Sequence, residues 1–130
     1  MKRADGKGAV VLGLAAAAAL LASGLIESAP EQAARKPNRF AGNPAAVRAG
    51  AKLFGRECAG CHGSQREGTS AAPSLRGSRI HEAPPGALFW VIRNGSVFQG
   101  MPSFAHLPEP QIWQIVTYLQ AAGDASPPAK

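Results

Sequence analysis

Cysteine and methionine are scarce in this chain of 130 residues, which holds two of each. Two cysteines, Cys58 and Cys61, cannot build the disulfide framework that stabilises many small exported domains. A structural zinc site usually takes four ligands from paired clusters, and the three histidines are not accompanied by a second C-x-x-C pair. A disulfide scaffold is therefore excluded, and a closed zinc site is disfavoured.

The chain also lacks any cluster of basic residues among aromatic ones, although its formal net charge is +6. The basic residues are mostly arginines scattered along the chain, so we expect no nucleic-acid binding. Two interpretations of the charge remain, namely solubility and steering toward an acidic docking face on a partner protein.

The first 26 residues have the layout of an export segment. Three basic residues precede an uncharged stretch, residues 8–26, that is rich in alanine and leucine. Residues 1–26 therefore predict either a cleaved signal peptide or a retained membrane anchor, since about 20 apolar residues can span a bilayer. In both cases the basic residues predict that the remainder lies outside the cytoplasm, in the periplasm or anchored facing it.

Residues 27–43 have the composition of a linker, with prolines, charges and little that could build a core. Residues 124–130 predict a flexible, proline-rich tail. The folded domain is thus expected over residues 44–123, which is roughly 80 residues. A domain of this size has a thin hydrophobic core and usually needs a disulfide, a metal or a cofactor.

Residues 58–62 read Cys-Ala-Gly-Cys-His, which is the C-x-x-C-H pattern of c-type haem attachment. Two thiols can add to the two vinyl groups on one porphyrin edge, and the two small residues between them set their reach. The adjacent His62 then lies under the ring, with its imidazole aimed at the iron. We therefore predict one covalent haem c, attached at Cys58 and Cys61 and ligated by His62.

Two other interpretations compete for this cysteine pair. A thioredoxin-like redox pair belongs near a strand–helix unit, and no strand pattern precedes Cys58. A simple disulfide would leave His62 without a role.

Met101 is the predicted second axial ligand, because methionine is the usual partner of histidine in cytochromes c and the other methionine is the initiator. Gly100 gives backbone freedom before it and Pro102 stiffens the backbone after it, which favours a loop over a helix core. His81 and His106 are the rival ligands. His81 lies beside two charged residues and is expected to be exposed.

Three helices are predicted, over residues 44–57, 85–93 and 108–122, while residues 63–83 are expected to form a loop around the haem edge. Asn43 is the expected N-cap of the first helix, and Gly50 is expected to let another helix approach closely. The apolar positions are Val47, Ala51 and Phe54 in the first helix, with Gly50 and Leu53 on the flank of that face, Leu88, Phe89 and Ile92 in the second, and Ile112, Ile115, Val116 and Leu119 in the third. Trp90 either faces the haem, with its N–H near a propionate, or is an ordinary core aromatic.

These residues resemble the class I c-type cytochromes, in particular the short bacterial monohaem domain. The resemblance covers residues 44–123 and is carried by Gly50, Phe54, residues 58–62, Pro73-Ser74-Leu75, Arg93-Asn94-Gly95, Gly100-Met101-Pro102, Trp113, Tyr118 and Leu119. It implies an all-α, small cytochrome c fold, in which three to four short helices and long loops wrap one haem c.

The resemblance also implies specific contacts and roles. The first and last helices should cross at right angles, with Gly50 and Phe54 against the region of Tyr118 and Leu119. The carbonyl of Pro73 should accept a hydrogen bond from the proximal His62, and Met101 matches the distal ligand.

The expected function is single-electron transfer between exported or membrane redox enzymes, such as a periplasmic dehydrogenase or a terminal oxidase, with no catalytic residues of its own. The alternative is a haem peroxidase or gas-binding protein with a labile sixth ligand. A third hypothesis, without haem, is an exported thiol–disulfide protein.

Overall fold

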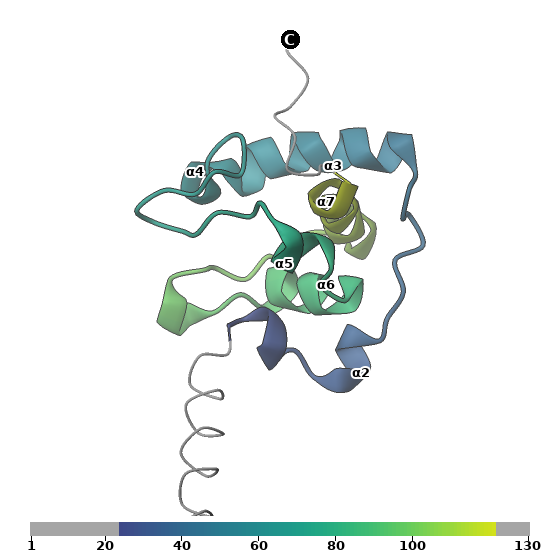
Figure 1. The fold of residues 1–130 in the computed structure, drawn as a ribbon, viewed down its shortest axis with the longest axis horizontal. Helices are drawn as coiled ribbons and strands as arrows, with labels where there is room; N and C mark the ends of the chain where they lie inside the picture. Colours follow the sequence, from purple (N-terminus) through teal and green to yellow (C-terminus); the bar gives the residue numbers. More distant parts are fainter. Residues whose placement is uncertain (1–23, 122–130) are drawn as a thin grey trace, which may run out of the picture.

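The computed structural model describes residues 24–121, and within that range the chain is helical and contains no named strand (Figure 1). Its three longer helices are α3 (Pro44–Glu57), α6 (Pro85–Asn94) and α7 (Glu109–Ala121). Between and before them lie α2 (Glu31–Ala34), α4 (Ala59–His62), α5 (Ser78–His81) and the 3-10 turns η1 (Ile26–Ser28) and η2 (Val97–Gln99). The predicted all-α class is confirmed.

Helix α3 begins and ends at the residues that the sequence predicted. The Asn43 side chain accepts a hydrogen bond from the Ala46 N–H over 3.1 Å, and Pro44 occupies the first turn, where its missing N–H costs nothing. The buried face differs from the predicted stripe, because it consists of Ala46, Gly50, Leu53 and Phe54. Val47 and Ala51 are only half-buried.

The rotation of α3 about its axis follows from its contact with α7. The two helices cross, and Figure 1 shows α7 almost end-on below α3. A Cβ at Gly50 would overlap the backbone carbonyl of Gln114 and lie 2.7 Å from the Cβ of Tyr118. Phe54, which is 1% exposed, packs against the Tyr118 ring with centroids 5.4 Å apart. The contact implied for Gly50 and Phe54 is confirmed, and Gly50 faces α7 because no larger residue fits there.

Helix α7 starts one residue later than predicted, and the carbonyl of Pro108 accepts the first-turn N–H groups of Gln111 and Ile112. Its predicted apolar stripe is buried, and the half-buried Trp113 stacks on Phe89 of α6 at a centroid distance of 4.4 Å. The buried core comprises Leu53, Phe54, Ile80, Ala83, Leu88, Phe89, Ile92, Phe104, Leu107, Ile112, Ile115, Val116 and Leu119.

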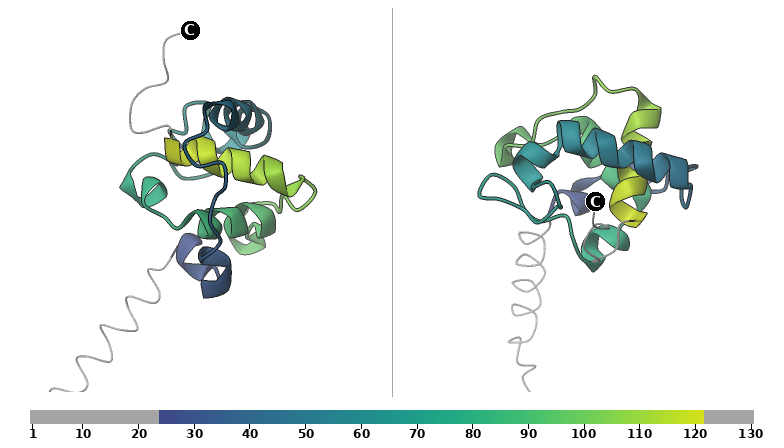
Figure 2. Two further views of the ribbon diagram at one scale, coloured as in Figure 1. Left: turned by 90° about the vertical axis from the view of Figure 1, so that its right-hand side faces the viewer. Right: turned by 90° about the horizontal axis from the view of Figure 1, so that it is seen from above.

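The segment 27–43, predicted to be a linker, packs on the domain. Its helix α2 and the turn η1 contact α6, as the two views of Figure 2 also show. The Asn38 amide donates to the Thr117 hydroxyl over 2.8 Å, although the two residues are 79 positions apart. Composition missed this packing because short turns with alanines and a few polar anchors have no helical periodicity to detect.

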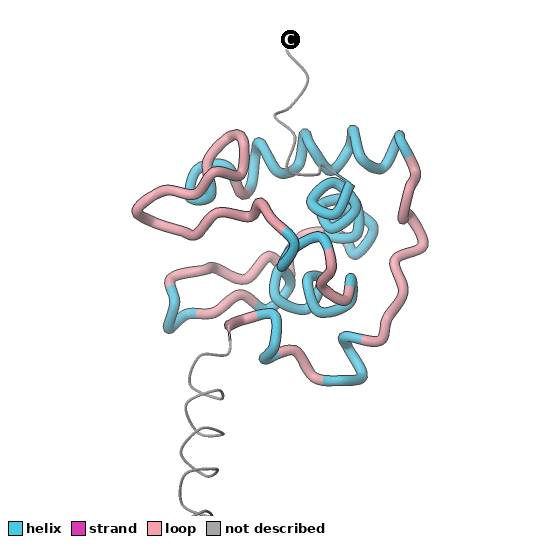
Figure 3. Tube along the Cα trace, viewed as in Figure 1, coloured by secondary structure: helices cyan, strands magenta, loops and turns pink. Residues whose placement is uncertain are grey.

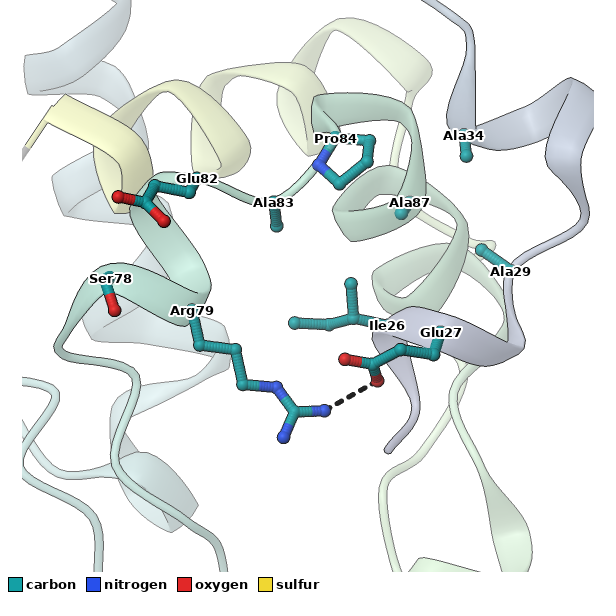
Figure 4. Close-up of a pocket in the computed structure, with 10 residues that line it drawn as sticks. All are labelled: Ile26, Glu27, Ala29, Ala34, Ser78, Arg79, Glu82, Ala83, Pro84 and Ala87. Atoms are coloured by element: carbon teal, nitrogen blue, oxygen red, sulfur yellow. Dashed lines mark hydrogen bonds and ion pairs between the residues drawn. The ribbon is translucent and has the colours of Figure 1, made fainter. Parts of the chain in front are cut away.

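An ion pair joins the beginning of this segment to α5. Arg79 donates to the Glu27 carboxylate over 2.7 Å, across a hollow in which Ile26 lies near Ala83 and Ala87 (Figure 4). Ile26 packs against the buried core, so the end of the predicted apolar stretch 8–26 belongs to the folded body.

The predicted loop 63–83 contains one helical turn that the sequence did not indicate, α5. The Gln120 side chain of α7 donates to the carbonyls of Ile80 and Ala83 over 3.1 and 2.8 Å, which holds α5 against α7. The loop after α4 and the turn around η2 project from one side of the helical body, on the left of Figure 3, whereas the segment between α2 and α3 runs along its right.

Residues 1–23 and 122–130 lie outside the described residues, and with them the predicted tail, Gly123 and most of the predicted signal or anchor. No helix in the described range is long and apolar enough to cross a bilayer.

Candidate functional site

The cysteine pair lies where α3 gives way to α4. The Cys58 N–H donates to the Phe54 carbonyl over 2.8 Å, and the Cys58 carbonyl accepts the N–H groups of Cys61 and His62 over 3.2 and 3.0 Å. This single turn brings both thiols and the imidazole to one corner of the domain. Because this turn follows directly on α3, the contact between α3 and α7 fixes the position of the turn in the domain.

The two cysteines are free thiols in different surroundings, with Cys58 half-buried and Cys61 exposed. Burial, with smaller contributions from the charges of Glu57 and Cys61, raises the pKa of the Cys58 thiol to about 12. A nucleophilic redox cysteine needs a lowered pKa, because the thiolate is the reactive form. The environment of Cys58 therefore disfavours thiol–disulfide exchange.

His62 is oriented by a backbone carbonyl, because its Nδ1 lies 2.8 Å from the oxygen of Pro73. A carbonyl oxygen can only accept, so Nδ1 carries the hydrogen and Nε2 keeps its lone pair. This tautomer is the one that suits a metal ligand, and the hydrogen bond fixes the orientation of the ring. The geometry implied for Pro73 is thus present.

The loop that brings Pro73 to His62 is held by hydrogen bonds to the turn of residues 58–62, called here the attachment turn. The Gly68 N–H donates to the His62 carbonyl over 2.7 Å, and the Thr69 hydroxyl donates to the Cys61 carbonyl. The Arg66 carbonyl accepts the N–H of Leu75 over 2.9 Å. Sequence reasoning missed Thr69, because its role depends on a loop geometry that no spacing rule encodes.

Arg66 is a second residue that the sequence did not single out. It is 3% exposed, has a backbone φ of +61°, and its guanidinium lies 5.6 Å from the centre of the Tyr118 ring. A cation over an aromatic face is attracted to it. Arg66 therefore connects the His62–Pro73 loop to α7 at the place where α7 meets α3.

Met101 closes a short turn on the same side of the molecule. Ser96 and Met101 exchange two backbone hydrogen bonds of 2.8 and 3.0 Å, with η2 between them. Gly95 adopts a φ of +63°, and a Cβ there would overlap the Pro102 carbonyl, so only glycine fits at the base of the turn. Met101 is half-buried and packs against the core.

The segment after Met101 is fastened to the end of α6. The Phe104 N–H donates to the Ile92 carbonyl over 3.1 Å, and the Ser103 hydroxyl donates to the Arg93 carbonyl over 2.6 Å. The turn that carries Met101 thus has two fixed ends. In both Figure 1 and the right panel of Figure 2, this turn and the loop after α4 lie on the same side of the helices.

The two rival histidines lie in different settings. His81, expected to be exposed, is half-buried, and its Nδ1 lies 3.0 Å from the Gln120 carbonyl because α5 packs on α7. His106 is exposed, with its ring 5.9 Å from that of Phe104. Trp90 is half-buried, and both of its predicted roles, haem-facing or ordinary core aromatic, stay predictions.

The donor set at this corner fits haem c. Within residues 24–121, no three His, Cys, Asp or Glu side chains gather to hold a metal ion. Two adjacent thiols and an imidazole with a free Nε2 lone pair are the groups that fasten a porphyrin from one side.

The comparisons with known proteins agree with this geometry. Residues 45–119 match the family described as cytochrome c oxidase, cbb3-type, subunit III. The quinohemoprotein alcohol dehydrogenase ADH-IIG of Pseudomonas putida is 38% identical over 98 residues, which are 73% of this chain and 13% of that protein. Cytochrome cL of the marine methylotroph Methylophaga aminisulfidivorans is 26% identical, with a TM-score of 0.56, over 65% of this chain and 58% of that one.

The chain thus spans a small part of the dehydrogenase and somewhat over half of cytochrome cL. The family match covers more than half of the chain, including α3, the C-x-x-C-H turn and Met101. The protein belongs to the cytochrome c family typified by subunit III of the cbb3-type oxidase, and its fold is that of a class I c-type cytochrome.

Proposed function

We propose that this protein is a monohaem c-type cytochrome that carries single electrons in the periplasm, either free or anchored by residues 8–26. Cys58 and Cys61 would hold the haem by thioether bonds, with His62 and Met101 as axial ligands. The observation that carries the proposal is the 2.8 Å contact between His62 Nδ1 and the Pro73 carbonyl, one turn from two free thiols.

When bound, the haem iron supplies one-electron chemistry, between the Fe(III) and Fe(II) states. The residues of this chain would keep the ligands fixed in both states. His62 is held in its ligating tautomer by Pro73, and the Met101 turn is closed by Ser96 and fastened to α6 through Ser103. A ligand set that does not move keeps the reorganisation energy of electron transfer low.

The partner is proposed to be a dehydrogenase or a terminal oxidase outside the cytoplasm. The matched region in Pseudomonas putida lies within a quinohemoprotein alcohol dehydrogenase, and the matched family is that of an oxidase subunit. Both names are those of redox enzymes or of their subunits, which supports a redox enzyme as the partner. We therefore infer an electron carrier or electron-transfer subunit, with no reaction catalysed by the domain itself.

The test is a Met101→Ala variant of protein matured in a periplasm, with His106→Ala as the matched control. Loss of the Met101 sulfur as an iron ligand should lower the reduction potential of the haem and let added imidazole bind to the iron, while the haem stays covalently attached. The His106 variant should keep the parent potential and spectrum.

Two results would contradict the proposal at different points. An unchanged potential in the Met101 variant would reject Met101 as a ligand, and free binding of small ligands by the parent protein would favour the peroxidase or gas-binding alternative. A mature protein with only the mass of its amino acids would reject haem attachment altogether.

A further inference from the structure

Arg66 is unusual in two respects within residues 24–121. It is the one charged residue that is buried there, and the one residue other than glycine with a positive φ, at +61°. Both features cost free energy, because a buried guanidinium loses its hydration and a side chain crowds the backbone in the left-handed region. A glycine would avoid both costs. Backbone strain of this kind is concentrated at functional sites, where the surrounding structure imposes it.

The backbone of Arg66 joins the two limbs of the loop that follows His62. Its carbonyl accepts the Leu75 N–H over 2.9 Å and the Ser74 hydroxyl over 3.0 Å, and both donors belong to the returning limb. Ser74 directly follows Pro73, whose carbonyl lies 2.8 Å from the imidazole of His62. Arg66 is therefore bonded to the residue next to the one that orients His62.

The side chain of Arg66 connects this loop to α7. Its guanidinium lies 5.6 Å from the centre of the Tyr118 ring, and that ring packs on Phe54 of α3 with centroids 5.4 Å apart. Phe54 in turn accepts the Cys58 N–H at the start of the attachment turn. The loop, α7 and the helix that precedes the attachment turn thus meet around the Tyr118 side chain.

We propose that Arg66 is a positioning residue for His62, the proximal ligand of the proposed function on which this inference rests. Its buried guanidinium fixes the loop on Tyr118, and the loop then keeps the Pro73 carbonyl on His62 Nδ1. The imidazole retains its ligating tautomer and its orientation because the acceptor cannot move away. A strained and buried cation is explained by this anchoring role, which a glycine could not perform.

The test is hydrogen exchange, followed by NMR, in the reduced holoprotein matured in a periplasm. Two protons report on the loop, His62 Nδ1–H and the Leu75 amide, and the amide of the fully buried Ile115 in α7 is the internal reference. Local opening exchanges a proton without unfolding the rest, so the comparison separates loop movement from a loss of global stability. The variant Arg66→Gly removes the guanidinium and also relieves the backbone.

We expect Arg66→Gly to accelerate exchange of the two loop protons about fivefold or more, and to change the Ile115 amide by no more than about twofold. Arg66→Lys keeps the charge without the planar fork and should show a smaller acceleration of the same protons, which covers the case in which the glycine variant does not mature.

A double-mutant cycle tests whether the anchor is the ring of Tyr118. Tyr118→Leu should also accelerate exchange of the loop protons, and adding Arg66→Gly to it should accelerate them little further, because both changes break the same contact. The matched control is Tyr118→Phe, which keeps an aromatic face and should exchange like the parent. Additive effects of the two changes would overturn the proposal.

Two results for Arg66→Gly would also overturn it. Equal acceleration of all three protons would mean that Arg66 acts on global stability alone, and unchanged loop protons would mean that the backbone hydrogen bonds hold the loop without the side chain. A parent protein that carries no covalent haem would refute the proposed function itself, whereas a haem-loaded variant with an unmoved loop refutes only the role of Arg66.

Discussion

Two glycines of α3 make a matched pair for testing the crossing that supports the site. Gly50 faces α7, where an added Cβ would meet the Gln114 carbonyl. Gly55 is exposed, and a Cβ added there would have nothing within 4 Å. Replacing a helical glycine by alanine normally stabilises a protein by up to about 1 kcal/mol, through helix propensity. Both variants gain this contribution, and only Gly50→Ala adds a methyl group that does not fit.

The magnitude follows from the packing. Inserting a carbon into a closely packed contact costs about 1–3 kcal/mol, and here the obstacle is backbone, which cannot turn away. Gly55→Ala should therefore raise the free energy of unfolding by up to about 1 kcal/mol. Gly50→Ala should lie about 1–3 kcal/mol below it, because the propensity gain is common to both.

The assay is thermal unfolding of the holoprotein, followed by far-ultraviolet circular dichroism. One kcal/mol corresponds to about 4–8 °C in a domain of this size, so the two melting temperatures should separate clearly, with Gly55→Ala the higher. If Gly50→Ala were as stable as Gly55→Ala, α3 and α7 would not be in backbone contact at Gly50, and the account of how α7 supports the cysteine turn would fail.

Two further predictions concern the N-terminal segment and the thiols. Asn38→Ala should lower the free energy of unfolding by about 1 kcal/mol in a denaturant titration, through loss of its hydrogen bond to Thr117. Arg79→Gln should lower it less, because the ion pair of Arg79 with Glu27 is exposed. A larger loss in the Arg79 variant would contradict this ranking. In protein made without haem, iodoacetamide at about pH 8 should modify Cys61 well before Cys58, because the Cys58 pKa of about 12 leaves almost no thiolate there. The Cys58 rate should rise with pH up to that pKa, and guanidinium should make the two thiols equivalent; equal rates in the absence of denaturant would show that Cys58 is not buried.

Local patterns in the chain were sufficient for the three longer helices and for recognising the C-x-x-C-H pattern. The bounds of α3 and its Asn43 cap, the buried stripe of α7, and the C-x-x-C-H pattern each depend on residues within a few positions of one another. Such features are set by local backbone geometry and periodicity, which a single sequence contains. The ligand roles of His62 and Met101 remain predictions that rest on the same short patterns.

The tertiary structure decided how those pieces meet. The buried face of α3 is shifted from the predicted centre at Val47 and Ala51 toward the predicted flank at Gly50 and Leu53, because the fit of Gly50 against α7 fixes the rotation of the helix. The predicted linker 27–43 packs on α6, and His81 is half-buried, because contacts such as that of Asn38 with Thr117 join residues far apart in the chain.

The sequence by itself therefore determined the class of fold and the three longer helices, since each is written in short-range spacing, and it led to the prediction of the haem-binding residues. Only the folded chain decided how the loop carrying Pro73 is held, which surfaces stay exposed and which segments close over the core. Those outcomes depend on packing between distant residues, where the free energy of a contact is shared by elements that no local pattern relates.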